Sequence, residues 1–304
     1  MWYTAKIIAP YLQCYEDVIL SPYRALYIIP APRRRIAIDD WIVINNFKWF
    51  RFLRDGDILW VDSALLRPNL PVDRNQFKRF RIITASRWDK EKLESYDIFV
   101  DDVIPRPFNE VALKLAYEEI IRRDGRINKI YDFAFIGWYE EPDRKNIKVI
   151  LELAKRCPTW KFMIISNVRE FTKLQNVEFR EFGKVSDVEK FILLYKSKYY
   201  LHLSGAEGFG MPPLEAMATG LNVIYLNCPA HNEFLNHPEN IRIEPNRVEE
   251  VSHRFGILRV GRTDVIEVYH ACERALRKPT ISVKDRISEM RPEKVATRLW
   301  EFLS

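Results

Sequence analysis

The stretch that decides the fold runs from Ser204 to Ile224 and reads SGAEGFGMPPLEAMATGLNVI. Two glutamates, Glu207 and Glu215, stand eight positions apart in it. Glycine has no Cβ, so Gly208 and Gly210 leave their backbone amides open to close approach. The proline pair that follows is typical of the first turn of a helix, where free N–H groups and the helix dipole favour an anion. The stretch therefore predicts a seat for a phosphate group.

The same stretch predicts local structure. Glu215 is expected in the first turn of the helix, where a carboxylate can accept hydrogen bonds from the paired hydroxyls of a ribose, and Glu207 on the loop before it. Gly220 is expected to end the helix, and residues 222–226 to resume as a buried strand. A glycine turn with a capping glutamate would give a similar but shorter pattern. The length and register of the motif favour the phosphate seat.

This pattern resembles the Glu-x7-Glu signature of retaining GT-B glycosyltransferases, especially the large family 4, whose usual form is close to EGFGLPxxEAMAxGxPVI. The match is nearly residue for residue. The resemblance implies that Glu215 holds the ribose of a nucleotide-sugar donor and that Glu207 is a catalytic residue near the donor sugar. It also implies that the backbone of Gly208, Phe209 and Gly210, with Met211 next in the chain, meets the diphosphate and the sugar.

A second pattern precedes this one. In the resembled family, a strand that ends in glycine is followed by an arginine and then by Lys-Gly, and both cations neutralise the donor diphosphate. Here the strand ends in Gly137, Lys145 takes the lysine position, Trp138 replaces the arginine and Asn146 replaces the glycine. Arg144 is the candidate for the missing charge. Because a leaving nucleoside diphosphate gains charge in the transition state, we expect Lys145 to act in catalysis.

Three further residues are weaker candidates for contacts with the base or the acceptor. Lys184 lies on a loop that touches the nucleobase in members of the resembled family. His231 follows a strand, at the edge where open sheets place ligands, and is expected to be exposed. Asp62 lies near a strand end, where a turn or cap role is the simpler interpretation.

No metal or other cofactor is expected. The Asp39-Asp40 and Asp101-Asp102 pairs do not converge without help from elsewhere, and the resembled enzymes generally need no bound metal. Four scattered cysteines contain no C-x-x-C pair, so neither a zinc site nor a disulfide framework is predicted. We expect no secretory leader, and no apolar run in the sequence reaches about 18 residues. We therefore expect a cytoplasmic protein, with contact at a membrane surface as an option.

The formal net charge of +6 is unevenly distributed. Between Arg24 and Arg87, thirteen Lys and Arg stand against six Asp and Glu. Within this region the segment 46–54, NFKWFRFLR, interleaves aromatic and basic residues. An amphipathic helix with Phe47, Phe50 and Leu53 inward explains it most simply. An anionic membrane surface or a lipid-linked acceptor is the next interpretation, and nucleic acid is disfavoured.

The alternation of strand-like and helical patterns predicts an α/β protein of the GT-B type, with two Rossmann-like domains whose parallel sheets face each other across a cleft. We expect an acceptor-binding domain over 1–110, a nucleotide-sugar-binding domain over 111–282, and a C-terminal helix over 283–304 that crosses back to the first domain. In the first half, strands are expected at 5–8, 26–29, 36–37, 58–61, 82–84 and 98–100.

The resemblance implies a retaining glycosyltransferase that acts on an unknown glycan, lipid-linked or protein acceptor. Two usual features of the family are missing: a glycine-rich loop after the first strand, and a histidine in the first domain, since no histidine precedes His202. Two alternatives therefore stay open. One is an epimerase or hydrolase of nucleotide sugars, and the other is a degenerate domain that binds a polyanion, membrane or protein partner without turnover.

Overall fold

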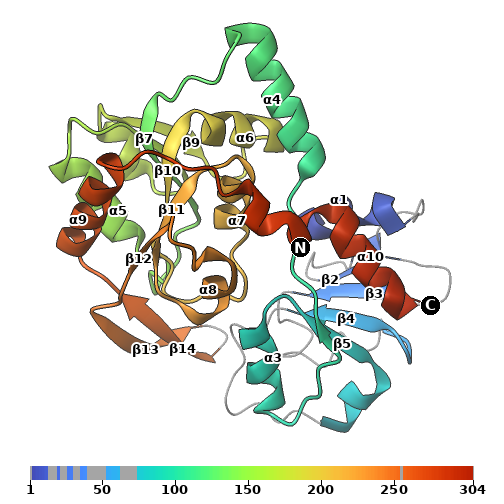
Figure 1. The fold of residues 1–304 in the computed structure, drawn as a ribbon. Coiled ribbons are helices and arrows are strands. Elements are labelled where there is room, and N and C mark those ends of the chain that lie inside the picture. Colours follow the sequence, from blue (N-terminus) through green and yellow to red (C-terminus); the bar gives the residue numbers. More distant parts are fainter. Residues whose placement is uncertain are drawn as a thin grey trace.

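The computed structural model describes residues 2–12, 19–20, 26–29, 35–39, 53–61, 74–253 and 256–303. These residues form two six-stranded sheets and one two-stranded sheet, with helices on the faces of the larger sheets (Figure 1). The predicted α/β class with parallel sheets is confirmed.

The sheet of the second half is parallel throughout. It contains β7 (Tyr131–Gly137), β8 (Phe162–Ser166), β9 (Val177–Glu181), β10 (Ser197–His202), β11 (Asn222–Leu226) and β12 (Ile241–Ile243). Their spatial order is β12-β11-β10-β7-β8-β9. The chain thus builds outward from β7 to one edge and then returns to build outward from β10 to the other. The two central neighbours are β7 and β10.

Helices cover both faces of this sheet. On one face, α5 (Ile147–Arg156) and α9 (Val265–Leu276) share a core with the strands. On the other lie α4 (Glu110–Asp124), α6 (Asp187–Tyr195) and α7 (Met211–Ala218). Strands that are covered on both faces have no side that faces solvent, so their sequences are nearly continuous apolar runs. The strand Phe162–Ser166 is an example, and all its residues are buried.

The sheet of the first half is mixed. Its order is β1 (Ile19–Leu20), β2 (Leu26–Ile29), β3 (Ile36–Asp39), β4 (Ile58–Val61), β5 (Arg81–Thr84) and β6 (Asp102–Val103). The strands from β3 to β6 are parallel, but β2 is antiparallel to both β1 and β3. The short helices η3 (Arg74–Arg79) and α3 (Arg87–Glu94) flank β5 in sequence.

Two expected strands of the first half are wrong. Residues 5–8 lie in helix α1 (Trp2–Ile8), which η1 (Ala9–Leu12) continues. The buried residues Ala5, Ile8, Ala9 and Leu12 follow the i, i+3, i+4, i+7 spacing of a helix face, and a short apolar run does not reveal that spacing at once. The strand expected at 98–100 lies instead at β6, where the ladder with β5 begins at Asp102.

The C-terminal residues form η5 (Lys284–Met290) and α10 (Pro292–Leu303), with Pro292 in the first turn of the latter. Val295 and Leu299 of α10 pack in one cluster with Ile8 of α1 and Trp60 of β4. Helix α10 therefore lies on the first half of the molecule, close to the N-terminal helix (Figure 1).

Several elements were not expected, among them η4 (Arg169–Lys173), α8 (Pro229–Leu235), and the hairpin of β13 (Arg247–His253) and β14 (Gly256–Arg262). Asp62 and residues 46–52 lie outside the described residues. Of the basic aromatic segment only Leu53, which is buried, and Arg54 are described. In the described part of the chain, no helix is both long and apolar enough to cross a membrane.

Candidate active site

The candidate site lies at the carboxyl ends of β7 and β10, where the strand order of the second sheet reverses. Gly137 ends β7, and the loop from Leu203 to Gly210 follows β10. The two strands are hydrogen-bonded neighbours, and the Tyr200 hydroxyl donates to the Ile136 carbonyl at 3.2 Å. Open parallel sheets bind ligands at such switch points, because loops that leave in opposite directions open a crevice.

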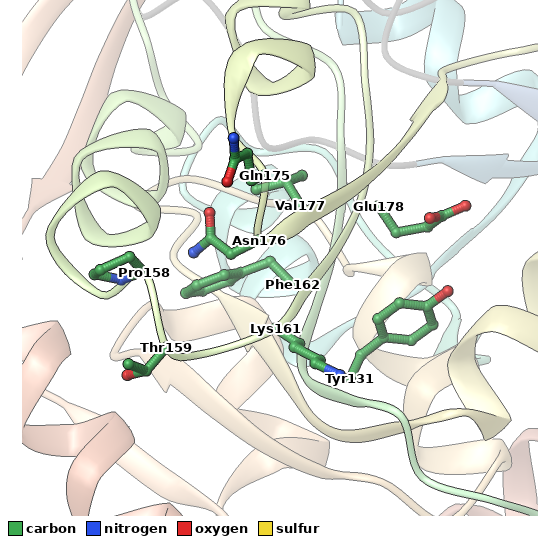
Figure 2. A pocket seen from close by; sticks show the side chains of 9 residues that line it. All are labelled: Tyr131, Pro158, Thr159, Lys161, Phe162, Gln175, Asn176, Val177 and Glu178. Atoms are coloured by element: carbon green, nitrogen blue, oxygen red, sulfur yellow. The ribbon is translucent and has the colours of Figure 1, made fainter.

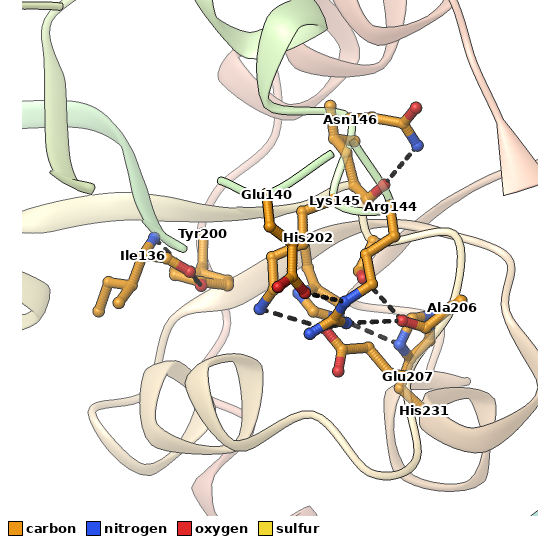
Figure 3. Close-up of polar contacts among 12 residues, drawn as sticks. Ile136, Glu140, Arg144, Lys145, Asn146, Tyr200, His202, Ala206, Glu207 and His231 are labelled. Atoms are coloured by element: carbon orange, nitrogen blue, oxygen red, sulfur yellow. Dashed lines mark hydrogen bonds and ion pairs between the residues drawn. The ribbon is translucent and has the colours of Figure 1, made fainter. Parts of the chain in front are cut away.

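Glu207 forms the centre of a buried ion cluster (Figure 3). Its Oε1 lies 3.3 Å from Arg144 Nη1 and 3.3 Å from Lys145 Nζ. Arg144 also donates to the Ala206 carbonyl at 2.9 Å and pairs with Glu140 at 3.3 Å. The Glu207 and Lys145 side chains are only 14% and 15% exposed. The structure thus brings together the two predicted catalytic residues and the arginine expected to supply the missing charge.

The charges of this cluster depend on one another. Burial by itself raises the pKa of Glu207, but the Lys145 ammonium and the Arg144 guanidinium hold that pKa well below its usual range. Burial lowers the pKa of Lys145, and Glu207 only partly offsets this. Two carboxylates, Glu207 and Glu140, thus meet two cations here, and Lys145 shares Glu207 with Arg144.

Lys145 lies in the turn before helix α5, and hydrogen bonds hold this turn in place. Asn146 has a left-handed backbone, with φ 51°, a conformation that asparagine tolerates better than other non-glycine residues. This explains how asparagine replaces the glycine of the resembled family. Its Nδ2 donates to the carbonyls of Leu203 at 2.8 Å and Gly261 at 3.0 Å, and the carboxylate of Asp143 accepts from the first amides of α5. The turn is therefore fixed to the loop that carries Glu207.

The glycines of the 204–210 loop have distinct roles. A Cβ on Gly205 would lie 2.0 Å from the Gly261 carbonyl oxygen, so only glycine fits against β14. Gly210 has φ 99° and precedes the first residue of α7, Met211. Phe209 is buried against Phe234, with ring centroids 5.1 Å apart. Among the described residues, the amides of Gly208, Phe209 and Gly210 have no hydrogen-bond acceptor, so they can donate to a ligand.

Glu215 lies one position further into the helix than expected, just past the first turn, because α7 begins at Met211 rather than at the proline pair. Its side chain is 4% exposed, and its Oε1 lies 2.7 Å from Lys190 Nζ. Lys190 in turn contacts Asp187 at 3.0 Å. The sequence analysis missed Lys190, a lysine that directly precedes the apolar run 191–194 of α6.

The expectation that His231 is exposed is wrong. Its side chain is fully buried, because α8 begins directly after β11 and turns the ring toward the sheet. His231 Nε2 donates to the Leu226 carbonyl at 2.9 Å, so its Nδ1 accepts from His202 Nε2 at 3.0 Å. Burial lowers the pKa of His231 to about 4 and lowers that of His202 as well. His231 therefore supports the glycine loop from below rather than meeting a base or an acceptor.

The remaining candidates differ in how exposed they are. Lys184 is exposed on the loop after β9, and Gly137 is buried at the end of β7. Trp138, in the arginine position, is 49% exposed and packs edge-on against Phe182. No group of three potential metal ligands is found among the described residues.

The two halves of the molecule touch at the candidate site. Ser86, the N-cap of α3, donates from Oγ to the Gly208 carbonyl at 3.0 Å. Glu233 of α8 accepts from the amides of Arg87 and Trp88, each at 2.9 Å. Both contacts were missed by the sequence analysis, because they join residues more than 120 positions apart.

A cavity of about 430 Å³ at the opposite end of the sheet is unrelated to this site (Figure 2). It is lined by residues at the beginnings of the strands, among them Tyr131, Phe162 and Val177. Asn176, one of two amide side chains that line it, already donates to the carbonyls of Ala154, Cys157 and Trp160. The Asn176 side chain thus connects the end of α5 and the loop after it to the start of β9.

The architecture is that of the GT-B proteins. Two solved structures with this fold are HepE of Anabaena in complex with UDP-glucose and the sucrose-phosphate synthase of Thermosynechococcus elongatus. HepE has a TM-score of 0.58 at 14% identity, covering 82% of this chain and 72% of HepE. The synthase has a TM-score of 0.59 at 14% identity, covering 84% of this chain and 69% of the synthase.

Residues 118–258 match the family described as glycosyl transferases group 1. "Putative glycosyltransferase ORF313" of Acidianus filamentous virus 1 is 27% identical over 289 residues, covering 94% of this chain and 85% of that protein. "Putative glycosyltransferase 48" of a Sulfolobus islandicus filamentous virus is 32% identical over 204 residues, covering 64% of this chain and 58% of that protein. Over this region the chain is thus similar to the group 1 glycosyltransferases.

Proposed function

We propose that the protein transfers a sugar from a nucleotide-sugar donor to an acceptor hydroxyl, with retention of anomeric configuration and without a catalytic metal. The observation that carries the proposal is the placement of Glu207 between Lys145 and Arg144, at the switch point and next to the 208–210 loop, whose amides have no acceptor among the residues that the structure describes. Such a site combines two cations, one carboxylate and a set of preorganised donors.

The chemistry follows from these groups. When the bond between the anomeric carbon and the diphosphate breaks, the electron pair leaves with the diphosphate, and its growing negative charge meets Lys145, Arg144 and the open amides. A bond forms to the acceptor oxygen on the same face of the sugar, and the acceptor proton passes to the departing phosphate oxygen. Glu207 lies where it can orient the sugar and hold both cations before the donor binds.

The two cations support the proposal that no metal is needed. In phosphate chemistry a divalent ion serves to neutralise the leaving oxygens, and paired Lys and Arg side chains serve the same purpose through charge-assisted hydrogen bonds. Lys145 and Arg144 are already held in place by Glu207 and the Ala206 carbonyl. When the donor binds, the two cations would pair with the diphosphate in place of Glu207.

Glu215 is proposed to bind the ribose. Its carboxylate is buried and pairs with Lys190 at 2.7 Å, which fixes its position. HepE was solved with UDP-glucose, which supports a nucleotide sugar as the donor class. The base and the sugar are left open, as are the acceptor, a cytoplasmic location and contact of segment 46–54 with a membrane surface.

Nucleotide binding provides the test. We expect one of UDP, GDP, ADP and TDP to raise the unfolding temperature of the wild type, and a ligand at a hundred times its Kd adds about 2.7 kcal/mol of stability. Glu215→Ala should lose this effect. Glu267→Ala, which removes an exposed glutamate from α9, is the matched control and should keep it.

Turnover separates the proposal from its alternatives. A wild type that binds a nucleotide but releases no sugar from any matching donor would favour the non-catalytic binding module. Product formation without an acceptor would favour a hydrolase or epimerase. Product anomers resolved by NMR decide between retention and inversion.

A further inference from the structure

A second cavity, of about 530 Å³, opens beside Glu207. Its walls come from three parts of the chain: helix α3, the loops after β10 and β11, and the hairpin β13–β14. The volume falls within the range of sites for small ligands, about 300–1,000 Å³. Lys145 and Arg144 do not line it, so it extends away from the cations assigned to the diphosphate.

The wall from α3 is aromatic and basic. Trp88, Lys92 and Tyr96 follow at intervals of four residues, which places them on one side of the helix and the turn after it. All three are half-buried, and Lys92 Nζ lies 5.6 Å from the centre of the Tyr96 ring. Leu93 enters the core instead. This side of α3 therefore lines the cavity, and Tyr96 at its end also packs against the core of the first half.

The wall from the hairpin combines aliphatic and charged groups. Alternation along the strands puts Val248 and Glu250 on one face, directly opposite Gly261 and Arg259. The other face packs Leu258 and Val260 against Ala206 of the candidate-site loop. Val248 is 52% exposed. The outer face thus offers apolar surface together with one carboxylate and one guanidinium.

The hairpin is fixed to the candidate site at its base. Gly261 N donates to the Gly205 carbonyl at 3.0 Å, and the Gly261 carbonyl accepts from Asn146 Nδ2 at 3.0 Å. Arg262 Nη1 donates to the Asp143 carbonyl. A ligand held by the hairpin would consequently be held in register with Glu207.

We propose that this cavity binds a saccharide ring of the acceptor and that the hairpin β13–β14 selects it. A sugar ring has apolar C–H faces and a rim of hydroxyls. The rings of Trp88 and Tyr96 suit the faces, and Glu250, Arg259 and Lys92 suit the hydroxyls. The inference rests on the proposed glycosyl transfer, and it assigns part of acceptor recognition to the second half of the chain.

The test uses saturation-transfer NMR with methyl glycosides of glucose, galactose, mannose and N-acetylglucosamine, each with and without the stabilising nucleotide. We expect at least one glycoside to receive saturation from the wild type. The signal should fall at least fivefold in Trp88→Ala and Arg259→Ala. Trp88→Phe, which keeps an aromatic face, should retain most of it, and so should the control Phe99→Ala, whose ring is 74% exposed.

Two results would overturn the inference: no glycoside signal from the folded wild type, or an equal signal from Trp88→Ala. A third is a loss of affinity in Trp88→Ala for the sugar nucleotide but not for the nucleotide, since the cavity would then hold the donor sugar. Failure of the proposed function has a different signature. The glycoside would bind, but no nucleotide would shift the unfolding temperature.

Discussion

The two halves of the molecule bury ionisable groups in different ways. In the first half such groups are distributed: Asp57 pairs with Arg35, and Arg106 lies over the Trp60 ring at 4.6 Å. In the second half they converge at one sheet edge around Glu207. A dispersed buried pair is explained by local structure, whereas ionisable groups that converge at a strand switch point are typical of a ligand site. The difference assigns the chemistry to the second half.

The sharpest way to break this comparison is to remove Lys145. If it neutralises the leaving diphosphate, Lys145→Ala should lower kcat by about 10²–10³-fold, the cost typical of losing one preorganised electrostatic contact. Lys148→Ala is the matched control. Lys148 lies three residues on and pairs with Glu141 at the surface, with 67% of its side chain exposed, so its loss should leave kcat within about twofold. Steady-state rates of both purified variants provide the measurement, and equal rates would remove Lys145 from the mechanism.

The pH dependence of stability also distinguishes the two halves, because all five histidines of the chain lie at or after position 202. The unfolded chain takes up protons near pH 6.5, whereas folded His231 stays neutral down to about pH 4. Between these values the unfolded state binds more protons, so stability falls as the pH drops through this window.

For His231 alone, the shift predicts a loss of about 2 kcal/mol between pH 7 and pH 5. The charged groups nearest the histidine pair are Glu207, Lys145 and Arg144. Urea midpoints of the wild type and His231→Gln at pH 7, 6 and 5 would measure the effect. His270→Gln, at a histidine 54% exposed, is the control and should keep the wild-type slope. A wild-type slope as shallow as that of His231→Gln would contradict the prediction.

How much could be predicted from the sequence also differs between the halves. In the second half, the strand that ends at Gly137 and the strand 222–226 after Gly220 were predicted correctly, because a glycine marks one end of each apolar run. The antiparallel pairing of β2 and the helical state of residues 5–8 could not be predicted, since a short apolar run fits either structure until its tertiary partners are known.

The residues of the candidate site also differ in how well the sequence predicts them. Glu207, Lys145 and Glu215 were found because a motif fixes their spacing along the chain. Lys190 and the His202–His231 pair were missed or misplaced because packing brings them together, and no spacing along the chain encodes that packing.

Glu233 links the halves and gives the smallest effect. Its carboxylate accepts from the amides of Arg87 and Trp88 at the start of α3, where the helix dipole favours a negative charge. Glu233→Ala should weaken the docking of α3 on the second half and lower kcat/KM by about tenfold, or about 1.4 kcal/mol. Nucleotide stabilisation should persist, because the residues proposed to bind the donor all lie in the second half. Glu94→Ala, at an exposed glutamate on α3, is the control. If Glu233→Ala lost nucleotide binding and transfer to the same degree, the contact would belong to the donor site itself, and the division of labour between the halves would have to be redrawn.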